Sequence, residues 1–365
     1  MTTSIEHVET AKKSWFTSAF PVPRTLHLSD VALYISDGML RFFEFSRARG
    51  RVYPKNFGTL HFPRFHLNAL NEKSREEVIT ALKKWALERR YKRVRAIIHE
   101  DEAYVFKVTV PTASERELRE AIEAVLEENV PIPPSDAVFE YEIMSVDRAA
   151  GETTVAVSVL NQASVLEATE IFASAGLEVV SIDTEARALA RALFPPNDPG
   201  IHAVLSIAEH HSTISIVESG AVVFSSSLKV GAADIDKEIA KVYGLTEEAA
   251  RAMKLEKAYT EIDGDMKLFE AMLPVFSVIR DEIGKVLVYW KGQSKKDKHF
   301  RDVADIVLVG SNAFIAGFDR YIAITTKIPA RVGSVWTNVL SVNETVPKLP
   351  RKDSLDYGVV IGALL

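Results

Sequence analysis

The chain has 365 residues, of which 47% are hydrophobic and 26% are charged, and its formal net charge is -6. This composition is typical of a globular protein, and the length predicts two domains or one large two-lobed unit. The absence of cysteine excludes disulfides, thiolate metal sites and cysteine nucleophiles.

No apolar run approaches the roughly 18 residues that span a bilayer, and the first residues lack the apolar core of a signal peptide. We therefore expect a cytoplasmic protein without a transmembrane segment. The acidic balance and the absence of regular aromatic interleaving in the basic clusters predict no nucleic-acid partner.

The first half begins with alternating residues at 24–65 that predict a three-stranded antiparallel meander with a turn at Asp37 and Gly38. A helix is expected at 74–90, where apolar residues recur at helical spacing. The elements expected after it are two short strands around an acidic turn (93–110), a helix with a capping box of Ser114 and Glu117 (114–130), two strands (137–146 and 153–160), a helix (163–175), a strand (177–183) and a helix (184–193).

A second series starts after the stretch FPPNDPG at 194–200, which predicts a hinge because it holds three prolines and a glycine. Another meander is expected at 201–231. The remaining expected elements are helices within 233–244, 246–259 and 268–293, a strand at 305–311, a helix from 312 and a helix of small residues at 356–365.

Both halves thus begin with a meander and continue into helices and strands. This duplication is similar to that of the actin and sugar-kinase superfamily, which holds its ligand between two lobes. The fold class we expect is α/β, an actin-like (ribonuclease H-like) two-lobe fold with a small inserted α+β subdomain in the first lobe. The expected parts are an N-terminal arm (1–23), lobe 1 (24–94 and 161–196), the insertion (95–160) and lobe 2 (197–365, with a helical subdomain at about 232–300).

In that superfamily the hairpin tips read aspartate, apolar, glycine and small hydroxyl residues. Glycine lets backbone amides approach phosphate oxygens, and the carboxylates hold hydrated magnesium. Here Tyr34 and Ser206 stand at the aspartate positions, and Ser36 and Ala208 at the glycine positions. The resemblance therefore implies a cleft that lacks the usual phosphate and magnesium groups.

Three longer stretches make the chain resemble the PilM family of type IV pilus assembly, which is itself similar to the cell-division protein FtsA. The first, 114–144, carries an acidic helix, a proline break and a strand with an acid–tyrosine pair; the second, 173–193, contains Asp183 and Glu185; the third runs from 228 to 254. The residues that fit the first motif are Glu128, Pro131, Pro133, Glu140 and Tyr141.

The resemblance implies a protein that binds ATP and docks a cytoplasmic tail of the membrane protein PilN, linking the inner-membrane ring to the pilus motor. It also implies a cleft residue at Lys254, whereas Arg251 stands where a ribose-contacting glutamate is expected. The positions that would form the altered nucleotide cleft are Tyr34, Ser36, Asp37, Gly38, Ser206, Ala208, Glu209, Lys254, Gly310, Ser311 and Asn312.

From these departures we expect a scaffold without catalytic residues or a bound cofactor, located at the cytoplasmic face of the inner membrane. Its partners would be a PilN-like tail, components of the pilus motor and further copies of itself. Two alternatives are an ATP-binding PilM-type ATPase that uses Asp37 or Glu209 as displaced carboxylates, and an FtsA-like division protein. The chain stops directly after the core, without the terminal membrane helix of FtsA, which favours the pilus alternative.

Three further features have competing interpretations. His210 and His211 beside Glu209 suggest a metal site, but adjacent strand residues point to opposite faces, so we expect none. Tyr34 either fills the phosphate position or is a core residue. At the N-terminus a docked arm is favoured over a helix that contacts a membrane or partner, with the aromatic and basic residues Lys12, Lys13, Trp15, Phe16 and Phe20.

Overall fold

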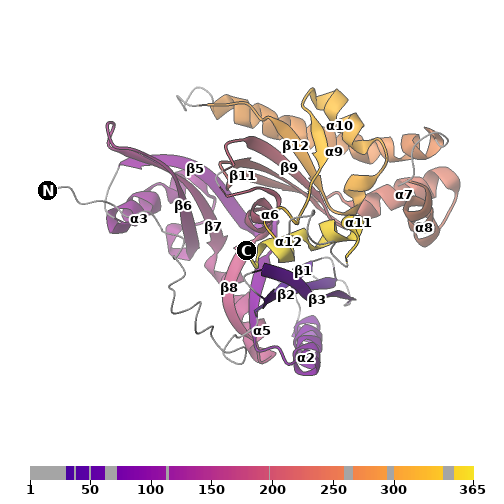
Figure 1. The fold of residues 1–365 in the computed structure, drawn as a ribbon, viewed down its shortest axis with the longest axis horizontal. Helices are drawn as coiled ribbons and strands as arrows, with labels where there is room; N and C mark the ends of the chain where they lie inside the picture. The colour runs from indigo at the N-terminus through magenta and orange to yellow at the C-terminus, as the bar shows by residue number, and fades with distance from the viewer. Residues whose placement is uncertain are drawn as a thin grey trace.

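The computed structural model describes residues 30–36, 38–48, 51–61, 72–111, 115–196, 198–258, 266–293, 300–339 and 349–365. The strands among these residues form two five-stranded sheets and one three-stranded sheet. Helices α6 (Glu185–Leu193) and α12 (Gly358–Gly362) pack on each other between the two larger sheets (Figure 1). The predictions at Lys12, Lys13, Trp15, Phe16, Phe20, Asp37 and Ser114 lie outside the described residues.

The first large sheet has the strand order β3-β2-β1-β4-β8. Its first three strands form the predicted antiparallel meander, while β1, β4 and β8 run parallel. Helices α2 and α5 cover one face, where Leu33 and Phe42 of the sheet meet Leu82 and Phe172 in one apolar cluster. The bounds are β1 (Val31–Ser36), β2 (Met39–Ala48), β3 (Arg51–His61), α2 (Glu72–Arg89), β4 (Arg93–Ile98), α5 (Gln162–Ser174) and β8 (Glu178–Thr184).

The second large sheet repeats this plan with the order β11-β10-β9-β12-β13. A meander again comes first, and two parallel strands extend it beside β9. This confirms the duplication that the sequence predicts. The strand β13 was not predicted, because three residues are too few to show an alternation. The bounds are β9 (Ile201–Ile207), β10 (Ser212–Glu218), β11 (Ala221–Leu228), β12 (Asp305–Val309) and β13 (Ala330–Val332).

The small sheet has the order β5-β7-β6 and packs on α3 and α4. Its core includes Ile122 and Leu126 of the helices and Val155, Val157 and Val159 of the central strand. The bounds are the 3-10 turn η2 (Glu100–Glu102), β5 (Ala103–Pro111), α3 (Glu115–Ala124), α4 (Leu126–Asn129), η3 (Pro134–Asp136), β6 (Ala137–Asp147) and β7 (Glu152–Asn161).

The start of the insertion differs from the predicted boundary at residue 95. Arg95 to Ile98 belong to β4, which pairs with β1 and β8 in the first large sheet. The small sheet begins only at Ala103, after η2. The two strands around the acidic turn therefore lie in different sheets. Residue pattern predicts a strand but not its neighbours, which is why the boundary was placed too early.

The remaining helices lie mainly on the second sheet. Figure 1 shows α7 and α8 at the right-hand end and α9 across the top of the molecule. Helix α7 ends at Gly244, whose φ of 65° suits a helix C-terminus. The bounds are α7 (Ala232–Tyr243), α8 (Glu247–Lys257), α9 (Met266–Gln293), η4 (Ser311–Phe314), α10 (Phe318–Thr326), α11 (Arg351–Ser354) and η5 (Leu355–Tyr357).

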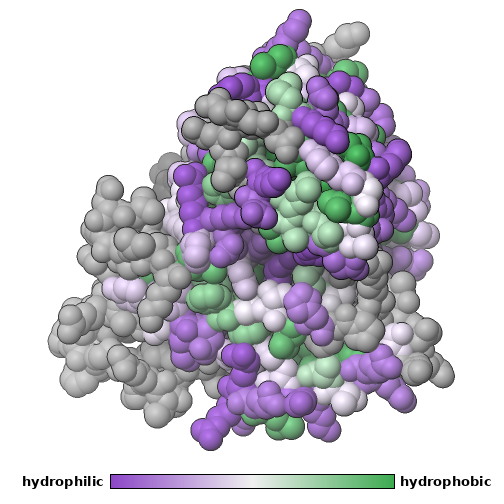
Figure 2. Space-filling view, turned by 90° about the vertical axis from the view of Figure 1, so that its right-hand side faces the viewer, coloured by the Kyte–Doolittle hydropathy of each residue, from purple (hydrophilic) through white to green (hydrophobic). Residues whose placement is uncertain are grey.

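The surface at the α7 and α8 end is shown in Figure 2, where hydrophobic residues form small groups among hydrophilic ones. Scattered apolar residues of this kind are normal for a solvated surface. Within the described ranges, no helix is long and apolar enough to cross a membrane.

Candidate functional site

The first hairpin tip lies at the end of β1, where Tyr34 and Ser36 are both buried. The hydroxyl of Tyr34 donates a hydrogen bond to Oε2 of Glu185 at 3.1 Å. Gly38 opens the return strand with a φ of 73°, a left-handed conformation that glycine adopts without strain. Tyr34 therefore links this tip to the start of α6.

The second tip joins β9 to β10 and rests on the start of α7. The carbonyls of Ala208 and Glu209 accept hydrogen bonds from the amides of Ala232 and Ala233 at 2.9 and 2.8 Å. A Cβ atom at Gly231 would lie 2.6 Å from the Glu209 carbonyl, so this close approach requires glycine. Amides at a helix N-terminus can bind phosphate, but these two already have backbone acceptors.

Glu185, the first residue of α6, is the point where both hairpins meet. Its carboxylate accepts hydrogen bonds from Tyr34 at 3.1 Å, Ser206 at 3.3 Å and Thr213 at 3.4 Å. Nε2 of His211 lies 3.4 Å from Oε2. Burial alone would raise the pKa of Glu185, but the hydrogen bond and charge of His211 hold it below its usual range. The side chains that replace the superfamily aspartates thus converge on one buried carboxylate.

A pair of histidines adds a direct contact between the lobes. Nε2 of His99, which follows β4, lies 3.1 Å from Nδ1 of His211, which precedes β10, and the ring centroids are 4.0 Å apart. Nδ1 of His99 lies 2.5 Å from Oδ1 of Asp101. Burial raises the pKa of the neighbouring Glu100 to about 7. Polar contacts therefore connect the two lobes at this junction.

The turn at 310–312, which was among the predicted cleft positions, contacts the second hairpin through its backbone. Gly310 has a φ of 92°, and a Cβ atom there would lie 2.5 Å from the carbonyl oxygen of Ile207. The amide of Ser311 donates to Asp356 at 2.7 Å, and burial raises the pKa of that carboxyl. Asn312 is buried. This turn is packed between β9 and the C-terminal segment.

Lys254 and Arg251 on α8 are both engaged in ion pairs. Nζ of Lys254 is 2.7 Å from Oδ1 of Asp236 and 3.2 Å from the carbonyl of Ala232, and it is 3% exposed. Arg251 contacts the carboxylate of Glu209 at 2.8 Å. The two side chains therefore tie α8 to α7 and to the second hairpin tip.

A second feature is a groove of about 300 Å³ between the small sheet and the first large sheet. Strand β6 lines one side, β8 lines the other, and α5 contributes to the lining. Both strands are the outermost strands of their sheets. The residues that line the groove are Val138, Phe139, Glu140, Ser158, Leu160, Val165, Thr169, Val179, Ser181, Ile182, Asp183, Thr184 and Arg187.

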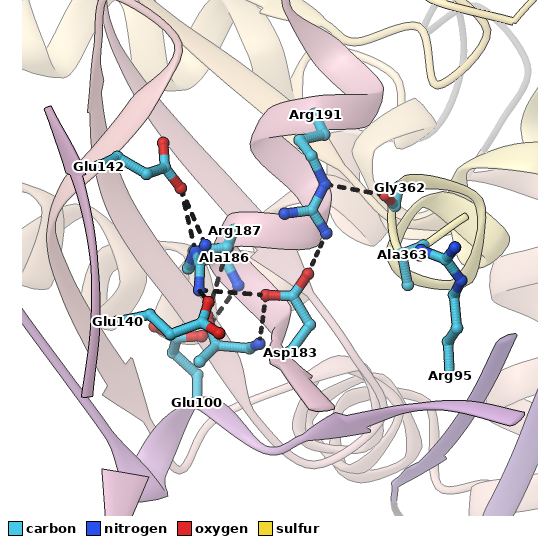
Figure 3. A network of polar contacts seen from close by, with 11 residues as sticks. Arg95, Glu100, Glu140, Glu142, Asp183, Ala186, Arg187, Arg191, Gly362 and Ala363 are labelled. Carbon is cyan, nitrogen blue, oxygen red and sulfur yellow. Dashed lines mark hydrogen bonds and ion pairs between the residues drawn. The ribbon is translucent and has the colours of Figure 1, made fainter. Parts of the chain in front are cut away.

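Arg187 closes one end of this groove. Figure 3 shows its guanidinium between the carboxylates of β6 and Asp183. It contacts Glu140 at 3.2 Å, Glu142 at 3.0 Å and Asp183 at 3.8 Å. Burial would lower the pKa of Arg187, but the charge of Asp183 and the two glutamates raises it. Arg191, one turn further along α6, bonds the same aspartate and the carbonyl of Gly362.

The five residues of the insertion motif do not form one site. Glu140 lines the groove, whereas the half-buried Tyr141 packs against the core of the small sheet. Glu128, Pro131 and Pro133 are exposed around the end of α4. The motif residues therefore include one that packs on the core of the insertion and others that lie on its surface.

Sequence reasoning missed the importance of Glu185, His99 and Arg187. Glu185 appeared only as part of a family motif, and the other two were not singled out. One signal was available in the sequence. Glu185 begins a helix rich in alanine and leucine, a composition that favours burial, and Glu185 is buried with the rest of this helix.

Comparison with known proteins agrees with this architecture. The family described as type IV pilus assembly protein PilM matches residues 33–365. A structure of a PilM-PilN type IV pilus biogenesis complex matches with a TM-score of 0.71 and 18% identity over 92% of this chain and 97% of that chain. MreB5 of Spiroplasma citri bound to AMPPNP matches with a TM-score of 0.52 and 14% identity over 93% and 95% of the two chains.

At these identities the structural likenesses establish the fold, which is actin-like as the sequence predicts. The family match covers nearly the whole chain and adds the biological system, the assembly of type IV pili. The chain therefore belongs to the family of type IV pilus assembly proteins PilM.

Proposed function

We propose that this protein is a scaffold at the cytoplasmic face of the inner membrane that binds the cytoplasmic tail of a PilN-like membrane protein in the groove between β6 and β8. The groove carries the proposal, because both strands are outermost in their sheets. An extended segment can add to such an edge through backbone hydrogen bonds. The matching PilM-PilN structure is itself a complex of two proteins of this system.

The side chains of the groove favour a particular kind of tail. Its floor is apolar, with Leu160, Val165 and Val179 among the lining residues. Its rim near Arg187 carries three carboxylates, which outnumber the two guanidiniums, of Arg187 and Arg191, that contact them. A short extended segment with apolar side chains and a basic residue complements this surface. Such a tail would connect the protein to the membrane.

The test is a binding assay with a labelled peptide that carries the cytoplasmic tail of the PilN-like protein of the same genome. Thr169→Trp places an indole in the groove and is expected to raise the Kd at least about tenfold, which corresponds to 1.4 kcal/mol. Ser174→Trp is the matched control, because this residue ends the same helix and is exposed outside the groove. Equal affinities of the two variants would refute the assignment of the groove.

We also propose that the cleft between the two hairpins is structural and that the protein does not hydrolyse ATP. The residues at the junction fit Mg-ATP poorly. Among the tip residues that the structure describes, the one carboxylate is that of Glu209, and it is paired with Arg251. Tyr34 and Ser206 occupy the aspartate positions and bond to Glu185, and two α7 amides are bonded to the second tip. Binding a triphosphate would require these contacts to break.

Thermal denaturation with and without Mg-ATP tests this second proposal. A ligand present at 100 times its Kd stabilises a protein by about 2.7 kcal/mol, which raises the Tm measurably. We expect an unchanged Tm and no release of phosphate. A rise in Tm together with phosphate release would support the ATPase alternative.

A further inference from the structure

Three side chains at the junction of the lobes have the chemistry of metal ligands. One donor atom each from His99, Glu185 and His211 lie within 4.8 Å of one another. The side chains are 10%, 2% and 5% exposed, respectively. They come from the end of β4, the start of α6 and the residue before β10, so the group joins both lobes.

The orientation of His99 is fixed by a second carboxylate. Nδ1 of His99 lies 2.5 Å from Asp101, so Nε2 is turned towards His211. In metal sites a histidine ligand usually bonds a carboxylate in the same way, which sets its tautomer and raises its basicity. The facing nitrogens of His99 and His211 are 3.1 Å apart. When both imidazoles are neutral, the two nitrogens at this separation share one N–H proton in a hydrogen bond. A metal cation could bind both nitrogens in place of that proton.

The types of donor atom select the class of cation. Two imidazole nitrogens and one carboxylate oxygen are typical of zinc sites with three protein ligands, which keep a fourth position for water. Magnesium and calcium prefer oxygen ligands throughout. Glu185 is buried, and a divalent cation bound to its carboxylate would compensate the cost of burying that charge.

We propose that His99, Glu185 and His211 bind a divalent transition-metal ion of the zinc class and that this ion fastens the two lobes together. The proposal is independent of tail binding, since the groove residues are not among the ligands. The bound ion would cross-link the two lobes next to the hairpin tips.

The two adjacent histidines considered from the sequence have different surroundings. His211 belongs to the buried group, whereas the charge of His210 acts on Asp234 of α7. The sequence argument assumed that both histidines lie on a strand, whereas they lie in the turn between β9 and β10. It also gave no indication of the distant partners His99 and Glu185. His210 is therefore a matched control for His211.

The experiment is a titration of the EDTA-treated full-length protein with Co²⁺, followed by visible absorption, and with Zn²⁺, followed by calorimetry. We expect one ion per chain, with the intense visible bands of four-coordinate cobalt, and no binding of Mg²⁺ at the same concentration. His99→Gln and His211→Gln should weaken binding at least about tenfold, and Asp101→Asn by about tenfold. His210→Gln should bind like the wild type.

Circular dichroism of the metal-free variants tests whether each variant is folded. If one of the histidine variants does not fold, Glu185→Gln serves as another ligand variant. A wild-type protein that binds neither Co²⁺ nor Zn²⁺ at micromolar concentration would overturn the proposal. So would ligand variants that bind as tightly as the wild type, or a loss of binding in His210→Gln as large as in His211→Gln.

Discussion

The buried ion pair between Lys254 and Asp236 provides a sharp test of the structure. Their charged atoms are 2.7 Å apart, and the side chains are 3% and 5% exposed. Burial raises the pKa of Asp236 and lowers that of Lys254, so it opposes the charge on each. Lys254→Met leaves the carboxylate buried without its cation and is expected to reduce the free energy of unfolding by about 3–5 kcal/mol.

This loss can be read from thermal denaturation. For a chain of 365 residues the entropy of unfolding is about 0.8 kcal/mol per kelvin, so the Tm should fall by about 4–6 °C. Lys237→Met is the matched control on α7. Lys237 lies 2.8 Å from Asp234, but the two side chains are 53% and 31% exposed. Removing such a solvated pair costs less than about 1 kcal/mol.

A double variant separates the charge from the loss of packing. Lys254→Met combined with Asp236→Leu removes both buried charges and should recover most of the lost stability. The deficit of Lys254→Met alone should also shrink as the pH falls through the raised pKa of Asp236, because the carboxyl then becomes neutral. If Lys254→Met costs no more than Lys237→Met, or if the double variant is as unstable as the single one, the reasoning is refuted.

Two further predictions concern backbone space and pH. Gly310→Ala should destabilise the protein by about 2 kcal/mol or more, because the φ of 92° and a carbonyl oxygen 2.5 Å from the new Cβ both oppose a side chain. The control Gly284→Ala, on α9, places a Cβ that meets nothing within 4 Å and should stabilise the protein by about 0.5–1 kcal/mol. Denaturant titration of both variants measures the two changes. Burial would lower the pKa of His202, but Asp305 and Asp198 raise this pKa in the folded protein above the ordinary value of 6.5. The protonated imidazole therefore stabilises the fold fully at a pH below 6.5, and this stabilisation is lost as the pH rises through the folded-state pKa. His202→Gln should therefore lower the Tm more at pH 5.5 than at pH 8.5, and an equal loss at both would contradict the charged state of this histidine.

The two regions to which we assign functions involve different residues. Tyr34, Glu185, His99 and His211 contact one another at the junction between the hairpins, and the groove is lined by other residues, Arg187 among them. The proposed tail would therefore contact the groove without replacing the contacts of the junction. The two proposals for these regions can be tested separately, since Thr169→Trp changes the groove and His211→Gln changes the junction.

The structure also shows the limits of local patterns. The strand at 93–98 was correctly predicted, but its partners β1 and β8 were not, so the start of the insertion was placed at residue 95, eight residues before the small sheet begins at Ala103. Lys254 stays a predicted cleft residue, and the sequence did not indicate that its ammonium group is paired with Asp236. In both cases the element was predicted and its contacts were not.

The sequence by itself determined the duplicated meanders and the order of most helices and strands, because alternation, helical spacing and turn residues act over a few neighbouring positions. The family followed from the resemblance of three longer stretches, and the family match confirms it. Only the tertiary structure decided that β6 and β8 face each other across a groove and that His99, Glu185 and His211 meet. These residues are far apart in the chain, and their contacts arise from the packing of separate sheets around α6. That packing depends on complementary surfaces, which no local pattern contains.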